Sequence, residues 1–245
     1  MSTLGEAWST AFSLLGGFDA KLLGIVGLSL RVSLSAVVFG SLIGLPLGAA
    51  VAVGRFAGRE PVTVLLNAFI GLPAVVVGLL VYLLLSRAGP LGQFGLLFTP
   101  AAMVVAQTVL ITPLIAAFAR QIVADAWREY REQLKSLGAS TGRAALTLLI
   151  DTRYSLVTVV LAAFGRAIAE VGAVMIVGGN IDGVTRVMTT TIALETSKGD
   201  LPLALALGLI LLAVVLLLNA LISALRRWRE RLDGGVAAPA AVLAT

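Results

Sequence analysis

Three charged side chains lie inside long apolar stretches of this 245-residue sequence: Arg31, Arg166 and Glu170. A charge within a membrane span is costly, so such a residue usually faces the interior of a helix bundle or a water-filled path. Arg166 and Glu170 are four residues apart, which allows them to pair on one helix face. Two interpretations follow. The pair is either a structural lock within the bundle or the polar wall of a conduit, with Arg31 as a third member.

A second polar group follows in residues 181–200, which are rich in hydroxyl side chains and hold Arg186, Thr189, Thr190 and Thr191. A guanidinium, hydroxyls and backbone N–H groups are the donors that a dianion needs where it enters a protein. The alternative is a solvated turn outside the membrane. The chemistry that both groups suggest is anion recognition.

The composition excludes several kinds of catalyst. The sequence has no cysteine and no histidine, which excludes disulfides, cysteine nucleophiles and the usual zinc sites. It contains no G-x-x-x-x-G-K-[ST] motif for a nucleotide phosphate, and its apolar stretches show no paired carboxylates or Ser/His/Asp set. We therefore expect a protein that is not an enzyme and that has no cofactor of its own.

The apolar stretches predict an all-α integral membrane protein. Hydrophobic residues make up 59% of the chain, against about 45–50% in ordinary soluble domains. Their distribution predicts five transmembrane helices, at about Leu22–Val53, Val62–Ser86, Pro100–Val123, Tyr154–Val177 and Leu201–Leu225. In the first of these, Gly40, Gly44 and Gly48 form a ridge of small residues for close helix packing. We expect an interfacial segment at 1–20, a transmembrane domain at 21–228 and a cytoplasmic tail at 229–245 that is disordered from Gly234.

A charged stretch, Asp125–Arg143, separates the third and fourth predicted spans. Gly138 lies within it and can bend a helix, and Ser140 or Thr141 can cap a second helix after the bend. Leu134 and Leu137 are three residues apart and form an apolar edge. We predict a helix–glycine–helix elbow that lies against the membrane with one face free for docking. The alternative is a solvated charged loop between two spans.

This stretch resembles the cytoplasmic loop of permease subunits of binding-protein-dependent ABC importers. That loop has the pattern Glu-Ala-Ala, three residues, Gly, nine residues, Ile-x-Leu-Pro. Here the glutamate is Glu132 and the glycine is Gly138, whereas Asp151 stands where the family has its proline. In the family the loop is the coupling helix that docks on the ATPase subunit. The resemblance thus implies ATPase coupling for Glu132, Leu134, Leu137, Gly138, Ala139 and Ser140.

Two later runs are similar to the oxyanion branch of these permeases: Gly165–Ala173 and Gly178–Arg186. The run Met188–Asp200 is closest to tungstate-type permeases, and similarity to the branch extends over most of Leu22–Arg227. The resemblance implies a translocation path that includes Arg31, Arg166, Glu170, Arg186, Thr189, Thr190 and Thr191.

The resemblance also implies an importer with several components. Two copies of the chain would form the pore, two ATPase subunits would bind ATP, and a periplasmic or lipid-anchored binding protein would deliver a tetrahedral oxyanion. Tungstate is the first candidate and molybdate the second, with transport by alternating access. A stand-alone secondary anion transporter or channel, using Arg31, Arg166 and Glu170 as its site, is the alternative.

The basic residues set the expected orientation. They alternate with the apolar spans and concentrate in the segments on the elbow side, which is the pattern of membrane topology rather than of nucleic-acid binding. With the elbow inside, five spans place the N-terminus outside and the C-terminus in the cytoplasm. The predicted location is the cell membrane of a bacterium or archaeon, in contact with lipid.

Overall fold

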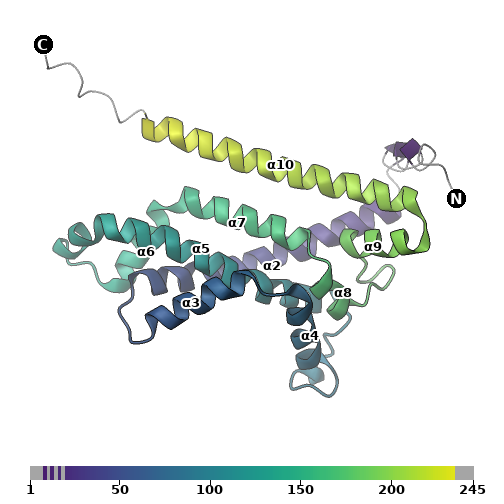
Figure 1. The fold of residues 1–245 in the computed structure, drawn as a ribbon, viewed down its shortest axis with the longest axis horizontal. Coiled ribbons are helices and arrows are strands. Elements are labelled where there is room, and N and C mark those ends of the chain that lie inside the picture. Colours follow the sequence, from purple (N-terminus) through teal and green to yellow (C-terminus); the bar gives the residue numbers. More distant parts are fainter. Residues whose placement is uncertain (1–7, 10–11, 14–15, 18–19, 235–245) are drawn as a thin grey trace, which may run out of the picture.

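The structure is a computed structural model that describes residues 8–9, 12–13, 16–17 and 20–234. This part of the chain is helical and contains no strand (Figure 1). The α-helices are α2 Ala20–Val53, α3 Arg59–Ile70, α4 Ala74–Leu85, α5 Pro100–Ser136, α6 Thr141–Asp151, α7 Arg153–Ile168, α8 Gly172–Gly178, α9 Met188–Lys198 and α10 Leu201–Gly234, with a 3₁₀ turn, η1, at Gly92–Phe94.

The helices confirm an integral membrane protein. Among the described residues, α2, α5 and α10 are each long and apolar enough to cross a membrane, and two bent pairs of helices raise the total to five. The interfacial segment predicted at residues 1–20 lies mostly outside the described part. Most of the tail predicted at residues 229–245 lies outside it too, but its first residues continue α10 as far as Gly234.

The two long helices α2 and α5 pack side by side through the predicted glycine ridge. A Cβ atom built on Gly44 would lie 3.0 Å from the side chain of Ile115, and one built on Gly48 would lie 2.5 Å from the carbonyl oxygen of Ala116. Contacts this short leave no room for a side chain, so the backbones meet directly. This ridge fixes the central pair of the bundle.

The second predicted span is not one helix. Helices α3 and α4 meet at an angle of 104°, and the break lies between Ile70 and Ala74. Pro73 explains the break, because it has no N–H for the preceding turn and restricts Leu72 to extended conformations. Beyond the break, α4 extends away from the long axis of the molecule (Figure 1). It packs on α8 so tightly that a Cβ atom on Gly78 would lie 2.6 Å from the Cα atom of Ala173.

The fourth predicted span is also interrupted. Helix α7 ends at Ile168 and α8 begins at Gly172, so the expected continuous helix from Tyr154 to Val177 is wrong. At its other end α7 meets α6 at an angle of 74°. The segment expected as a loop at residues 181–200 contains helix α9.

The third predicted span ends much later than expected. Helix α5 continues past Val123 to Ser136 without interruption. Its 37 residues correspond to about 55 Å of helix, against about 30 Å of hydrocarbon in a bilayer. The first arm of the predicted elbow is therefore the projecting end of this span.

The close approach of α2 and α5 generates a first prediction. Gly48→Ala should lower the free energy of unfolding by about 1–3 kcal/mol, because its methyl group would collide with the backbone of α5. The measurement is the folded fraction of the detergent-purified protein after graded heating. Gly27→Ala is the matched control, since nothing lies within 4 Å of a Cβ atom at Gly27. Equal stability of the two variants would contradict a ridge that fixes this packing.

Candidate functional site

The elbow between α5 and α6 is closed by backbone hydrogen bonds. Gly138 adopts a left-handed conformation with φ of 70°. Its N–H donates to the carbonyl of Lys135, and the N–H of Ala139 donates to the carbonyl of Leu134, both at 2.9 Å. This pair of bonds is the Schellman arrangement that satisfies the last carbonyls of a helix and favours glycine at the left-handed position. The backbone conformation at this position thus favours glycine, and the predicted bend at Gly138 is present.

Ser140 then begins the second arm of the elbow. Its side-chain oxygen accepts a hydrogen bond from the N–H of Arg143, and its carbonyl accepts one from the N–H of Ala144 at 2.8 Å. Of the two residues predicted as a cap, Ser140 is the one that the structure uses. The cap starts α6 immediately after the bend, so that the two arms form one rigid corner.

The two leucines of the expected apolar edge have different surroundings. Leu134 packs against the buried cluster that joins the ends of α2, α5 and α6, including Val53 and Leu148. Leu137 is 81% exposed, which is a larger exposed fraction than that of the other large apolar side chains of the corner. The prediction of a single edge is therefore wrong: Leu134 anchors the corner, and Leu137 projects from it together with the exposed Leu146 and Ile150 of α6.

A polar cavity of about 1000 Å³ lies behind the elbow. Its lining includes five arginines and the acids Asp125, Glu129 and Glu132. The arginines are Arg55, Arg59, Arg120, Arg128 and Arg131. Arg59 closes the end of α2 by donating to the carbonyls of Val51 and Ala52, at 2.9 and 2.8 Å. This end of the bundle is strongly polar, and its arginine excess suits the cytoplasmic side of a membrane.

The pair Arg166–Glu170 lies at the junction of α7 and α8. Nη1 of Arg166 donates to Oε2 of Glu170 at 2.9 Å, while Oε1 of the same carboxylate accepts from the N–H of Ala173 at 3.2 Å. Glu170 is 4% exposed and lies outside both helices. The expected pairing on one helix face is thus replaced by a pair that spans a helix end. The carboxylate both holds Arg166 and satisfies the start of α8.

Two further polar side chains fasten this junction. Gln107 of α5 donates from Nε2 to the carbonyl of Ala167 at 2.9 Å, and Thr189 donates from its hydroxyl to the carbonyl of Glu170 at 2.8 Å. These carbonyls lie where the regular helical hydrogen bonds of α7 stop, and each gains a side-chain donor from another helix. Gln107 was not expected as part of a site, although a buried amide within an apolar helix is a signal for one.

The threonines of α9 do not form an open portal. Thr189, Thr190 and Thr191 are buried. The hydroxyls of Thr190 and Thr191 donate to the carbonyl of Val187. Their donors are used inside the protein, which contradicts the alternative of a solvated turn. Their predicted place on a translocation path stays a prediction.

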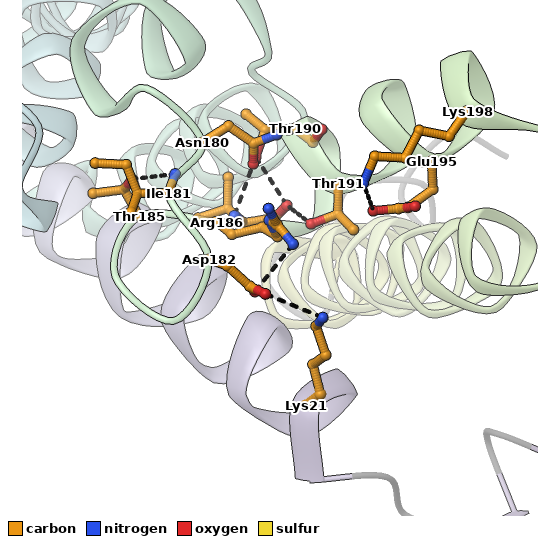
Figure 2. A network of polar contacts seen from close by, with 11 residues as sticks. Lys21, Asn180, Ile181, Asp182, Thr185, Arg186, Thr190, Thr191, Glu195 and Lys198 are labelled. Atoms are coloured by element: carbon orange, nitrogen blue, oxygen red, sulfur yellow. Dashed lines mark hydrogen bonds and ion pairs between the residues drawn. The ribbon is translucent and has the colours of Figure 1, made fainter. Parts of the chain in front are cut away.

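A network of charged side chains lies at the end of the molecule opposite the elbow. Figure 2 shows Asp182 between Lys21 and Arg186. Nζ of Lys21 lies 3.2 Å from Oδ2 of Asp182, and Nη1 of Arg186 lies 3.0 Å from Oδ1. The hydrogen bond from Lys21, with Arg186 nearby, lowers the pKa of the Asp182 carboxyl below its usual value.

Arg31 belongs to this network rather than to the Arg166 pair. It lines a cavity of about 480 Å³ together with Lys21, Asp182 and Arg186. The structure thus separates the predicted path residues into an outer cavity that holds Arg31 and Arg186, and a buried junction that holds Glu170 and Thr189. Lys21 and Asp182 were not expected, because 161 residues separate them and no local pattern links them.

The described part of the chain contains no group of three or more acidic, histidine or cysteine side chains able to hold a metal ion. Its polar sites are instead rich in cations. These sites are a projecting corner, a buried junction and a basic cavity at the opposite end, all carried on membrane helices. Their combination is typical of a membrane-embedded transport protein.

Comparison with known proteins identifies the class. Residues 44–231 match the family of inner membrane components of binding-protein-dependent transport systems, and the chain belongs to this family. A probable anion ABC transporter permease of Haloferax volcanii is 44% identical over 218 residues, which cover 87% of this chain and 93% of that protein. The chain is therefore a permease subunit of an ABC importer.

Two other relatives differ in their similarity to the chain. A tungstate uptake permease of Peptoclostridium acidaminophilum is 39% identical over 226 residues, which cover 92% of this chain and 99% of that protein. A molybdenum transport permease of Mycobacterium tuberculosis is 28% identical over 203 residues, covering 78% of this chain and 76% of that protein.

The two bonds of the Glu170 carboxylate generate a second prediction. Glu170→Ala should lower the free energy of unfolding by about 1–3 kcal/mol, because it removes both the ion pair and the acceptor for Ala173. Glu170→Gln keeps an acceptor oxygen and should cost less. The charge swap Arg166→Glu with Glu170→Arg should fail to restore stability, since an arginine has no acceptor for an N–H.

Thermal unfolding of the purified variants measures the order of their stabilities. Glu195→Ala is the control, because Glu195 is similarly buried and pairs with Lys198. Full recovery of stability in the swapped variant would show that Glu170 acts through its charge alone.

Proposed function

We propose that this permease imports a tetrahedral oxyanion, with tungstate as the first candidate and molybdate as the second. The observation that carries the proposal is the nearly full-length similarity to the tungstate uptake permease, set against the lower identity to the molybdenum permease. The outer cavity supports a dianion, because three of its lining side chains, Lys21, Arg31 and Arg186, are cations.

The proposed energy source is ATP bound by separate ATPase subunits that dock on the elbow. Glu132, Leu137, Ala139 and Ser140 lie on or next to the projecting corner, while Leu134 and Gly138 hold its shape. An exposed leucine on a rigid corner suits insertion into a cleft of a partner. Because α5 runs unbroken from this corner into the bundle, movement of the corner would be transmitted along it in an alternating-access cycle.

The other proposed partners fit the remaining surfaces. The face of α2 that carries Leu34, Phe39 and Leu42 is exposed, and so is the face of α10 that carries Leu216 and Leu217. We assign these apolar faces to lipid and to a second copy of the chain. A binding protein would dock at the end that carries α9 and the outer cavity, with the N-terminus outside and the C-terminus in the cytoplasm.

Arg166 and Glu170 belong to the proposed translocation path in different ways. Glu170 is buried and each of its carboxylate oxygens accepts a hydrogen bond, which supports a structural role, whereas the Arg166 side chain is 41% exposed and can face the path. A stand-alone secondary anion transporter is the alternative function. It would use an ion gradient rather than an ATPase, and it gives no reason for a projecting corner at the cytoplasmic end.

Uptake measurements test the proposal. Cells that express the chain with its ATPase and binding protein should accumulate tungstate, measured by mass spectrometry of cell metal. Gly138→Val should lower uptake by roughly tenfold or more, since a β-branched residue is strained at a positive φ and would deform the corner. Gly142→Val is the control, because a Cβ atom at Gly142 meets open space.

The outcomes separate the alternatives. Uptake that persists with an inactive ATPase and collapses with the ion gradient would identify a secondary transporter. Normal uptake by Gly138→Val, at equal protein level, would remove the elbow from the coupling.

The proposed orientation generates a fourth prediction. Single cysteines at Ser140 and Ser197 should react from opposite sides of the membrane, and the sequence has no native cysteine to interfere. An impermeant maleimide should label Ser197→Cys in intact cells and Ser140→Cys only after lysis. Labelling of both positions in intact cells would contradict the orientation.

A further inference from the structure

The outer cavity is built around one carboxylate held by two cations. It lies between the first turns of α2, from Ala20 to Arg31, and the segment Asp182–Arg186. Each oxygen of the Asp182 carboxylate has its own cationic donor, Lys21 on one side and Arg186 on the other. Two oxygens bound by separate cations are the contacts that a tetrahedral oxyanion would make in the same place.

The charges of this cavity do not balance. Among the described residues that line it, Lys21, Arg31 and Arg186 carry three positive charges and Asp182 carries one negative charge, which leaves a net charge of +2. In the described part of the chain no carboxylate lies within ion-pair distance of Arg31, and Nε of Arg186 is buried without a hydrogen-bond partner there, in a side chain that is 13% exposed. The excess equals the charge of a divalent oxyanion, and unused donors are present to bind it.

Arg31 lies well along α2 from the end of the helix that carries Lys21. It lies eleven residues after Ala20, which corresponds to roughly 16 Å along α2. Arg31 is nonetheless exposed. A charge at this depth is strongly disfavoured against lipid, so this face of α2 must border water or another charged group. The cavity therefore extends inward from Lys21 at the outer end.

Asp182 is held loosely, whereas the segment that carries it is anchored. The side chains of Lys21 and Asp182 are 55% and 56% exposed, and ion pairs of this kind contribute little. The anchor is Thr185, which is buried. Its hydroxyl donates to the carbonyl of Gly178 at 2.6 Å and accepts from the N–H of Ile181 at 2.9 Å. Gly183, at φ of 72°, completes a turn from which the carboxylate can swing away while the base stays fixed.

We propose that this cavity is a receiving site for a divalent tetrahedral oxyanion, and that the Asp182 carboxylate occupies it as a tethered substitute until the anion arrives. This inference rests on the proposed function. The incoming dianion takes the donors of Lys21 and Arg186 and adds Arg31, and the carboxylate turns out toward solvent. When the anion moves inward the carboxylate returns, so the two cations are neutralised between deliveries and loss of the anion back to the outside is opposed.

An acidic face of a partner protein would find the same cations. The buried Nε of Arg186 and the depth of Arg31 favour a small anion, because a protein surface reaches exposed side chains such as Lys21 first. Docking of an acidic protein at these cations would overturn the proposal.

The test is equilibrium dialysis of tungstate against the purified full-length permease in lipid nanodiscs at low salt. Asp182→Asn should bind tungstate about tenfold more tightly, because the competing charge is gone. Arg31→Gln should bind it about tenfold more weakly. Arg31 is exposed and has no ion pair with any described residue, so this variant should fold normally. Asp200→Asn is the control, since Asp200 is exposed and lies outside the cavity.

Each outcome decides the question. The site would be overturned if Asp182→Asn bound tungstate no more tightly than the wild type and Arg31→Gln bound it as tightly as the wild type. If Arg31→Gln binds tungstate as the wild type does but lowers the uptake that depends on the binding protein, the cavity is a protein-docking surface instead. ATP-dependent tungstate uptake with no tungstate bound in dialysis would overturn this site alone and leave the proposed function standing.

Discussion

The contact between α2 and α5 is the constraint on which the other elements depend. Gly44 and Gly48 bring the two backbones so close that the helices share one surface. Inside a membrane this contact gains little from the hydrophobic effect, because lipid tails are as apolar as the side chains, so shape must hold the helices together. The paired helices reach from the outer cavity at Lys21 to the cluster of Val53 and Leu148 at the elbow.

Around this pair, the shorter helices meet at breaks that polar groups must satisfy. Backbone groups in a bilayer have no water to bind, so a broken span needs internal partners. The break after α7 receives them from Gln107, Thr189 and the Glu170 carboxylate. A charged residue in a span therefore need not mark a path for ions. Glu170 is explained by the helix ends that it closes.

The sequence predicted those features that depend on local pattern. The long apolar runs predicted α2 and α10, and the glycine spacing predicted the α2–α5 contact. Gly138 and Ser140 predicted the elbow, because a left-handed turn and a helix cap each depend on one residue type. The residues of the coupling corner follow from the resemblance, and their role in docking stays a prediction.

The features that were missed depend on contacts distant in sequence. The sequence stays apolar across both breaks. A hydropathy pattern therefore does not reveal that α3 and α4, or α7 and α8, are separate helices. Gln107 contacts a carbonyl sixty residues away, and Lys21 contacts Asp182 at 161 residues. The run of threonines in α9 suggested either an anion portal or a solvated turn. The side chains are buried, and the hydroxyls of Thr190 and Thr191 bond to the nearby carbonyl of Val187, as short hydroxyl side chains often do. Their part in a translocation path stays a prediction.

The positions of the helix breaks limit how a movement at the elbow can reach the outer cavity. Because α2 and α5 are unbroken and locked together, a force applied at the elbow moves them as one body. The short helices α4 and α8 pack closely on each other through Gly78 and Ala173, but breaks at residues 71–73 and 169–171 separate them from the elbow arms. Buried contacts nonetheless hold them to the long pair, because Val77 and Val174 pack in one cluster with Val32 of α2. Arg31 lies on the long pair, and the segment that carries Arg186 is tied to it, since the N–H of Met188 donates to Oγ of Ser29 at 2.8 Å. The cations of the outer cavity are therefore linked to the elbow through α2 and α5 rather than through the broken spans.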